Sequence, residues 1–144
     1  MLYIMANSTE LQLRQISAVL MKRNMYTLFS NLTDENLKEE IKKVLMDRYF
    51  QEPARPVRES IGRVISVIMD THFMKEKGWV ELIAAIDQKT DPNAPVKERE
   101  KAIALISYLV ELTAHEINTK YEKYLHFFMA NLKDPERSVF YIFV

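Results

Sequence analysis

The chain of 144 residues has no cysteine and only two glycines, Gly62 and Gly78. The absence of cysteine excludes disulfides, thiolate metal sites and a cysteine nucleophile, and it fits a reducing compartment. Scarce glycine argues against tight β-hairpins and against glycine-rich loops that cradle phosphates. Together with abundant Leu, Ile, Met, Glu and Lys, this composition predicts an all-α chain.

The chain also lacks an excess of charge of either sign, since 20 basic residues face 20 acidic ones. A domain without net positive charge has no overall electrostatic footprint for nucleic acid, so we expect no nucleic-acid partner. No apolar run reaches the roughly 18 residues of a membrane span. The apolar start, residues 1–5, is too short for the apolar region of a signal peptide. We therefore expect a soluble intracellular protein that binds no membrane.

Apolar residues recur at helical spacing along most of the chain. After a short helical end at residues 1–6, the pattern predicts helices over residues 10–23, 34–50, 57–72, 79–86, 96–113 and 119–132. In the helix at 57–72 the spacing is clearest, with Val57, Ile61, Val64, Ile65 and Ile68 on one face.

The inner faces of the other helices are predicted in the same way. For residues 10–23 the pattern predicts that one side of the helix faces inward, with Leu13, Ile16, Leu20 and Met21. For residues 34–50 the predicted stripe is Leu37, Ile41, Val44, Leu45 and Met46. We interpret Trp79, the single tryptophan, as a buried anchor beside Gly78 in preference to a binding hot spot.

Four arginines mark an internal repeat. Arg14, Arg58, Arg99 and Arg137 lie near predicted helix starts, 44, 41 and 38 residues apart. Prolines recur just before the last three of them, at positions 53 and 56, 92 and 95, and 135. A helix pair repeated about every 40–47 residues is the signature of HEAT and armadillo arrays, because one pair cannot bury its own apolar faces. We expect each arginine to bind carbonyls or acids of the adjacent repeat.

The predicted fold is therefore an all-α, HEAT-repeat (armadillo-like) right-handed α-solenoid. Residues 1–144 form a single solenoid fragment of about 3 to 3.5 helix hairpins that is truncated at both ends. The predicted repeats cover about residues 1–23, 34–73, 78–113 and 119–144.

Several segments, in order, resemble the first repeats of the importin β (karyopherin β) family. The stretch LRQISAVLMKR at residues 13–23 is similar to the second helix of an early repeat, and residues 34–50, Val57-Arg58 and residues 79–86 continue in family order. The resemblance covers roughly residues 1–135, and a complete family member is several times longer. It implies a nuclear transport receptor fragment that binds the Ran GTPase, cargo and nucleoporins in cytoplasm and nucleus.

The sequence carries no recognisable catalytic or metal-binding motif. His72, His115 and His126 have no partner histidine three or four residues away. His115-Glu116 begins like a zinc-protease motif, but Thr119 stands where the second ligand would be. We expect no metal, no cofactor and no enzymatic activity.

The second helix of each HEAT hairpin lines the concave surface of the array, where we expect a partner protein to bind. The candidate residues are Lys22, Arg23, Glu59, Arg63, Ser66, Asp70, Glu100 and Glu111. The resemblance implies Ran contacts for Lys22, Arg23, Arg63 and Asp70. On the alternative interpretation, the same residues form salt bridges between repeats or a solvated ridge.

Two other function classes stay open on the sequence alone. One is a HEAT scaffold of another complex, such as a phosphatase regulatory subunit or an assembly factor. The other is an enzyme-associated helical domain. Co-purification with a phosphatase would favour the first, and a deep closed pocket with converging titratable groups would favour the second.

Overall fold

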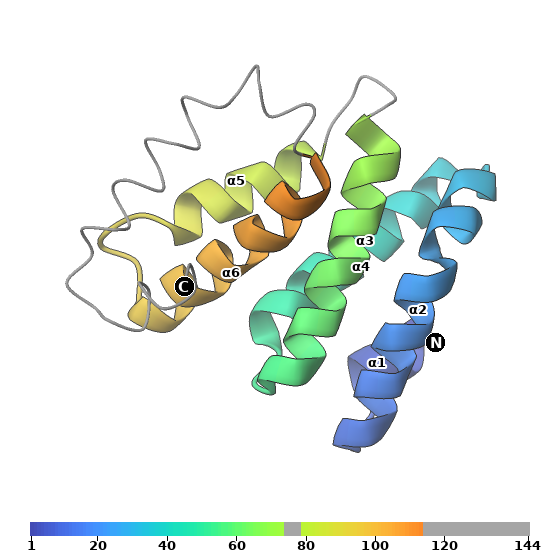
Figure 1. The fold of residues 1–144 in the computed structure, drawn as a ribbon, viewed down its shortest axis with the longest axis horizontal. Helices are drawn as coiled ribbons and strands as arrows, with labels where there is room; N and C mark the ends of the chain where they lie inside the picture. The colour runs from blue at the N-terminus through green and yellow to red at the C-terminus, as the bar shows by residue number, and fades with distance from the viewer. Residues whose placement is uncertain (74–78, 114–144) are drawn as a thin grey trace. The chain divides into compact units, whose positions relative to one another are not determined.

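A computed structural model describes residues 1–73 and 79–113 of the chain, and each regular element within these ranges is an α-helix (Figure 1). The helices are α1 (Leu2–Asn7), α2 (Leu11–Asn31), α3 (Glu35–Gln51), α4 (Arg55–Phe73), α5 (Val80–Lys89) and α6 (Val96–Thr113). The prediction of an all-α chain is confirmed for this part. The predicted helix at 119–132, the repeat at 119–144 and Arg137 lie outside the described residues.

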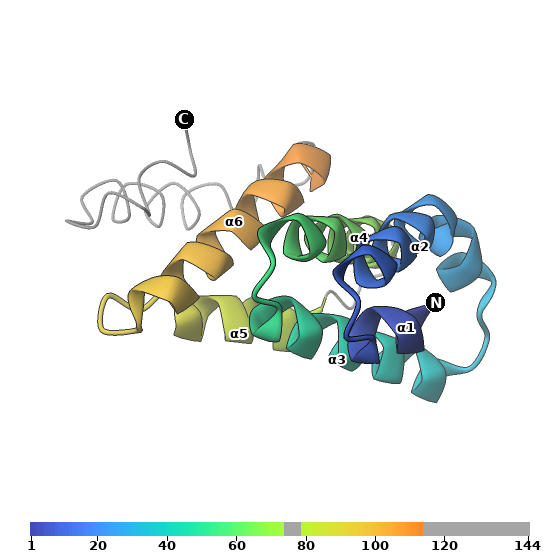
Figure 2. The same ribbon diagram turned by 90° about the horizontal axis from the view of Figure 1, so that it is seen from below.

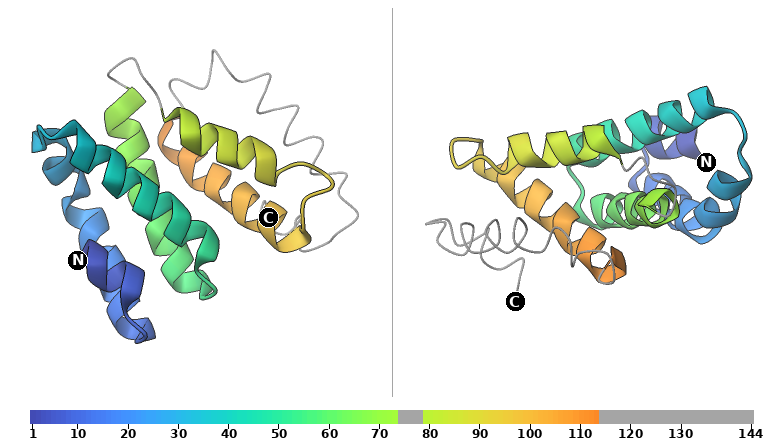
Figure 3. Two further views of the ribbon diagram at one scale, coloured as in Figure 1. Left: turned by 180° about the vertical axis from the view of Figure 1, so that it is seen from behind. Right: turned by 90° about the horizontal axis from the view of Figure 1, so that it is seen from above.

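The chain divides into two compact units, Met1–Gly78 and Trp79–Val144. In the first unit, α1 packs against α2 and α3 against α4, each pair forming a hairpin. The two hairpins also touch each other, α2 against α4 and α1 against α3. Figure 2 shows the result as two layers, with α2 and α4 in one and α1 and α3 in the other. From behind, α1 lies over α2 and α3 lies over α4 (Figure 3). This arrangement is compatible with a helical solenoid.

The core of the first unit confirms the pattern read from residues 57–72. The five predicted core side chains of α4 are fully buried: Val57, Ile61, Val64, Ile65 and Ile68. From the other layer, Met5 of α1 and Leu45 and Tyr49 of α3 are also fully buried. Removing apolar surface from water stabilises a fold by about 25 cal/mol per Å², so these buried side chains stabilise the unit.

The second helix is longer than the sequence predicts. It continues from Leu11 to Asn31 and does not stop near Arg23. Its last third contains Asn, Tyr, Thr and Ser, which are mediocre helix formers. Met25 and Phe29 continue its buried face, however, and this tertiary contact extends the helix beyond what local propensity supports.

The inward face predicted for α2 is wrong for three of its four residues. Leu13 is 49% exposed, Ile16 56% and Leu20 39%, and only Met21 is buried. The buried stripe is Arg14, Ser17, Ala18, Met21, Met25 and Phe29. The apolar side chains of α2 thus form two stripes, and the one that its neighbours α1 and α4 help to bury contains small residues and an arginine.

The stripe predicted for the third helix is only partly correct. Of its five residues, Leu45 is buried, whereas Leu37 is exposed and Ile41, Val44 and Met46 are half-buried. The aromatic Tyr49 and Phe50 complete the buried face, and their rings meet edge-on at 5.2 Å between centroids. The helix begins at a true N-cap, because the Asp34 carboxylate accepts hydrogen bonds from the backbone N–H groups of Asn36 and Leu37.

The second unit contains the hairpin of α5 and α6, which pack against each other. Trp79 directly precedes α5 and is buried, as the sequence predicts, beside Leu82 and Ile86 on the buried face of that helix. On α6, Ala102, Ile103, Leu105, Ile106 and Leu109 are buried and form its inner face. In the turn, the Thr90 hydroxyl donates to the Ile86 carbonyl and helps to end α5.

Candidate protein-binding surface

The repeated arginine has one structural role in all three described hairpins. Each stands in the first turn of the second helix and donates backward to backbone carbonyls of the preceding turn. Arg14 Nη1 reaches the carbonyls of Ser8 and Thr9 at 3.0 and 3.1 Å. Arg58 Nη1 reaches the Glu52 carbonyl at 3.1 Å. Arg99 Nη1 reaches the carbonyls of Pro92 and Ala94 at 3.1 and 2.6 Å. These arginines therefore hold the turn of their own hairpin, where the sequence predicts only contacts to the adjacent one.

Arg14 also makes the predicted contact with an acid of the next hairpin. Its guanidinium binds the Glu52 carboxylate through two hydrogen bonds, Nε to Oε2 at 3.1 Å and Nη2 to Oε1 at 3.2 Å. Glu52 lies in the turn between α3 and α4 and is fully buried. Arg48 and the backbone N–H of Ala54 donate to the same carboxylate at 2.8 and 3.0 Å. This cluster joins the two hairpins of the first unit.

Burial by itself raises the pKa of Glu52, since it penalises the charged carboxylate. The hydrogen bonds from the Ala54 N–H and the Arg14 side chain, with the positive charges of Arg48 and Arg14, outweigh that effect. The pKa of Glu52 is consequently held below its ordinary value of 4.5, and the cluster is ionised at neutral pH. Glu52 is not among the residues predicted from the sequence, where its one signal is an acid six residues before the repeated arginine of its hairpin.

A smaller charge cluster holds the second unit. Glu98 in the first turn of α6 accepts from Lys89 at the end of α5 at 2.6 Å and from Lys101 at 3.3 Å. Burial by itself raises the pKa of the Glu98 carboxyl. The hydrogen bonds and positive charges of the two lysines outweigh this effect, so the pKa of Glu98 also lies below its ordinary value. Because the lysines come from both helices, the cluster fixes the α5–α6 corner.

Four of the candidate residues for partner binding lie on the layer formed by α2 and α4. Lys22 and Arg23 are exposed on α2, and Arg63 and Asp70 are exposed on α4. Since α2 and α4 pack side by side, these four residues belong to one helical layer, as a shared partner surface requires.

The remaining candidates are less accessible. Ser66 is 3% exposed and its hydroxyl donates to the Arg63 carbonyl, which leaves it no surface for a partner. Glu59 is half-buried and accepts from Arg55 Nε at 2.8 Å. Glu100 is half-buried on α6 in the second unit. Glu111 lies near the end of α6, and its side chain is outside the described part.

The exposed apolar stripe of α2 consists of residues that the helical pattern predicts to be core. Leu13, Ile16 and Leu20 lie at helical spacing i, i+3 and i+7. In the repeat register Leu13 corresponds to Val57 and Leu20 to Val64, both fully buried on α4, which has α2 as its neighbour. Contiguous exposed apolar side chains of this kind indicate a contact surface.

Within residues 1–73 and 79–113, no group of three or more histidine, aspartate or glutamate side chains is placed to hold a metal ion. Over the same residues, none of the helices combines the length and the hydropathy needed to cross a lipid bilayer.

No protein-family model matches the chain. A comparison with curated proteins finds a relative in Schizosaccharomyces pombe described as "Probable importin subunit beta-4". The two are 30% identical over 97 residues, which is 67% of this chain and 9% of the relative. The chain thus spans less than a tenth of the length of the relative, and within that stretch it is similar to an importin β-type protein.

Proposed function

We propose that the chain is a non-catalytic, protein-binding part of a HEAT-type solenoid of the importin β kind. It binds the Ran GTPase in its GTP form and transport cargo, and it works in cytoplasm and nucleus. The observation that carries this proposal is the 30% identity to an importin β-type protein over 67% of the chain. A second support is that the second helices of the described hairpins share the same arginine-to-turn hydrogen bonds.

The described fold supports a longer array. Two hairpins stack with like helices in contact, as the units of a solenoid do. On α2, Leu13 and Leu20 occupy the positions at which α4 buries Val57 and Val64. A preceding hairpin would cover this stripe in the way that α2 covers α4, so the protein functions as one part of a continuous stack.

The binding surface in this proposal is the α2–α4 layer. Lys22, Arg23 and Arg63 supply exposed positive charge there, and Asp70 supplies negative charge. Mixed charge of this kind contributes orientation and specificity more than raw affinity. No step of bond making or breaking is assigned to the chain, since it has no cysteine nucleophile and no glycine-rich phosphate loop.

The test is a pull-down of the folded chain with Ran loaded with GTP or with GDP, after circular dichroism has established its helicity. We expect retention of Ran-GTP well above Ran-GDP. Equal retention of the two forms, or none, contradicts Ran recognition by this segment. Selective co-purification of a phosphatase catalytic subunit in place of Ran supports the rival scaffold function.

A further inference from the structure

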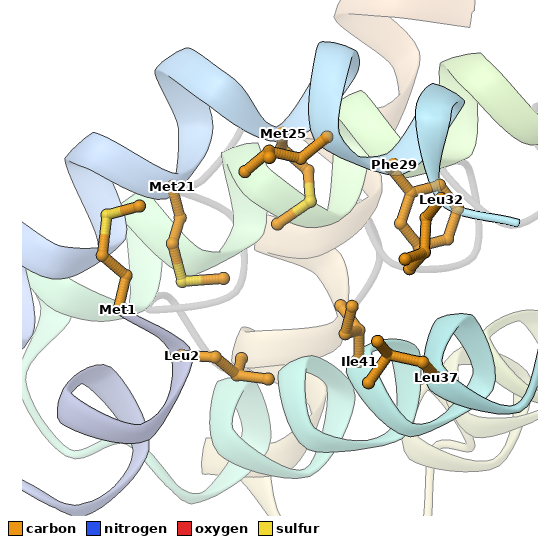
Figure 4. A pocket seen from close by; sticks show the side chains of 9 residues that line it. Met1, Leu2, Met21, Met25, Phe29, Leu32, Leu37 and Ile41 are labelled. Carbon is orange, nitrogen blue, oxygen red and sulfur yellow. The ribbon is translucent and has the colours of Figure 1, made fainter. Parts of the chain in front are cut away.

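An apolar groove opens between α2 and α3 at the end of α1. It encloses about 290 Å³, many times the roughly 30 Å³ that one water molecule occupies in the liquid. Two methionines of α2, Met21 and Met25, line it one helical turn apart. In Figure 4 both side chains extend from α2 toward Leu37 and Ile41 of α3, with their sulfur atoms on the side of the groove. The groove therefore brings open space next to two thioethers.

This position separates the two side chains from other buried methionines. Met21 and Met25 are each 4% exposed, and Met69 of α4, which is not part of the groove lining, is 2% exposed. A side chain as buried as these three reacts with a solute through local opening of the structure. The groove gives Met21 and Met25 a second route, because it admits several molecules of the size of water. Hydrogen peroxide is only slightly larger than water, so it reaches both sulfur atoms in the folded state.

We propose that Met21 and Met25 form a site of reversible oxidation by hydrogen peroxide. A lone pair of the thioether sulfur attacks one peroxide oxygen, so that an S–O bond forms and the O–O bond breaks. The hydroxide that leaves takes the proton of the new S–OH group and becomes water. The sulfur is thereby oxidised to a sulfoxide, and methionine sulfoxide reductases restore the thioether. This inference goes beyond the proposed function and does not rest on it.

The surroundings of the two methionines determine what oxidation does to the first unit. The other side chains that line the groove are apolar and offer the sulfoxide oxygen no hydrogen-bond donor. A polar group placed against apolar neighbours without a hydrogen-bond partner destabilises a fold. Met21 and Met25 also belong to the buried stripe of α2, together with Ala18 and Phe29. Oxidation therefore loosens the packing of α2 in its hairpin, and reduction restores it.

The first experiment treats the whole folded chain with dilute hydrogen peroxide and follows each methionine by peptide mass spectrometry. Met69 is the buried reference, and Met46 of α3, half-buried and outside the groove lining, is the accessible one. We expect Met21 and Met25 to oxidise at least about tenfold faster than Met69, because Met69 reacts only through local opening. Their rates should approach that of Met46. Equal rates for Met21, Met25 and Met69 overturn the proposal.

A second experiment tests whether peroxide arrives through the groove. Leu37→Trp puts a larger side chain into the groove, since Leu37 is one of its lining residues. Val19→Trp, at an exposed position of α2 outside the groove lining, is the matched control. We expect Leu37→Trp to slow the oxidation of Met21 and Met25 at least about threefold, and Val19→Trp to change it by less than about twofold, because only a filled groove forces reaction through local opening. Equal rates in the two variants contradict access through the groove.

A third measurement tests the effect on the fold. Oxidation of the natural chain should lower its Tm by about 5 °C. The double change Met21→Leu with Met25→Leu should abolish this fall, because leucine keeps the apolar volume but has no sulfur to oxidise. Circular dichroism before treatment establishes that this variant is folded. The same fall of Tm in the double variant would assign the effect to other methionines and overturn the proposed switch.

Discussion

At the scale of single residues, one side chain type organises the hairpins. Arg14, Arg58 and Arg99 each donate to carbonyls that a tight helix–helix turn leaves without helical partners. The guanidinium group has several N–H donors. Arg14 can therefore donate to two turn carbonyls and also form two hydrogen bonds with the Glu52 carboxylate. A lysine could not make this set of contacts with one nitrogen.

Loss of the Arg14 side chain should strongly destabilise the first unit. Arg14→Ala leaves the fully buried Glu52 carboxylate with Arg48 as its remaining ion-pair partner, and breaking a buried pair costs about 3–5 kcal/mol. Arg55→Ala is the matched control. Its ion pair with Glu59 is largely exposed, so we expect a loss of less than about 1 kcal/mol. Urea denaturation of both variants measures the difference, and similar losses would refute the role assigned to Arg14.

The Glu52 cluster should make stability depend on pH in the acid range. Because the pKa of Glu52 in the folded state is lowered from 4.5, its stabilising effect is fully present above that pH and is lost as the pH falls through the folded pKa. Glu52→Gln should therefore be less stable than the natural chain at pH 7, and the gap should narrow as the pH falls below 4.5. Urea midpoints of both proteins across this range test it; a constant gap would contradict it.

At the scale of helices, the same residue type at the same position of the repeat can be exposed in one hairpin and buried in another. Leu20 and Leu105 stand at the same position, six residues after the repeated arginine, yet Leu20 is 39% exposed and Leu105 is fully buried. The second helices of the two hairpins have different surroundings although their sequences follow one pattern. Burial at this position depends on what packs against the helix, so the helical period alone does not predict it.

The two leucines should respond differently to truncation. Leu105→Ala removes a fully buried side chain and should cost about 2–5 kcal/mol, because a cavity adds to the lost transfer free energy. Leu20→Ala should cost less than about 1 kcal/mol in this chain, since its side chain already meets water. Thermal and urea unfolding followed by circular dichroism compare them. A large loss for Leu20→Ala would mean that its stripe is covered in solution.

At the scale of the whole molecule, the proposed role requires a surface that binds without holding the fold together. Lys22 and Arg23 meet this condition, since both are exposed on α2. The double change Lys22→Glu with Arg23→Glu should weaken Ran-GTP binding at least about tenfold, which is about 1.4 kcal/mol, with little change in Tm. Lys43→Glu on α3, exposed on the other layer, is the charge control. Equal weakening by the control would show a general effect of charge.

Much of the fold could be predicted from local pattern. The bounds expected for α3 and the starts expected for α4 and α6 agree with the structure to within two residues, because their apolar spacing and flanking prolines are strong local signals. The end of α2 could not be predicted from local pattern, since the buried side chains of Met25 and Phe29 extend the helix through contacts with distant residues. Among the candidate residues for partner binding, Lys22 and Arg63 are exposed, while Ser66 is buried.

By itself the sequence determined that the chain is helical and that its hairpins recur in register, because glycine scarcity, proline turns and the arginine spacing act over a few residues each. Only the tertiary structure decided which of the two apolar stripes of α2 is covered, which acid receives Arg14, and that a groove remains beyond α1. The physical reason is that burial is a property of neighbours. An amphipathic period shows that a helix has a face, but only the neighbouring helices determine what covers it.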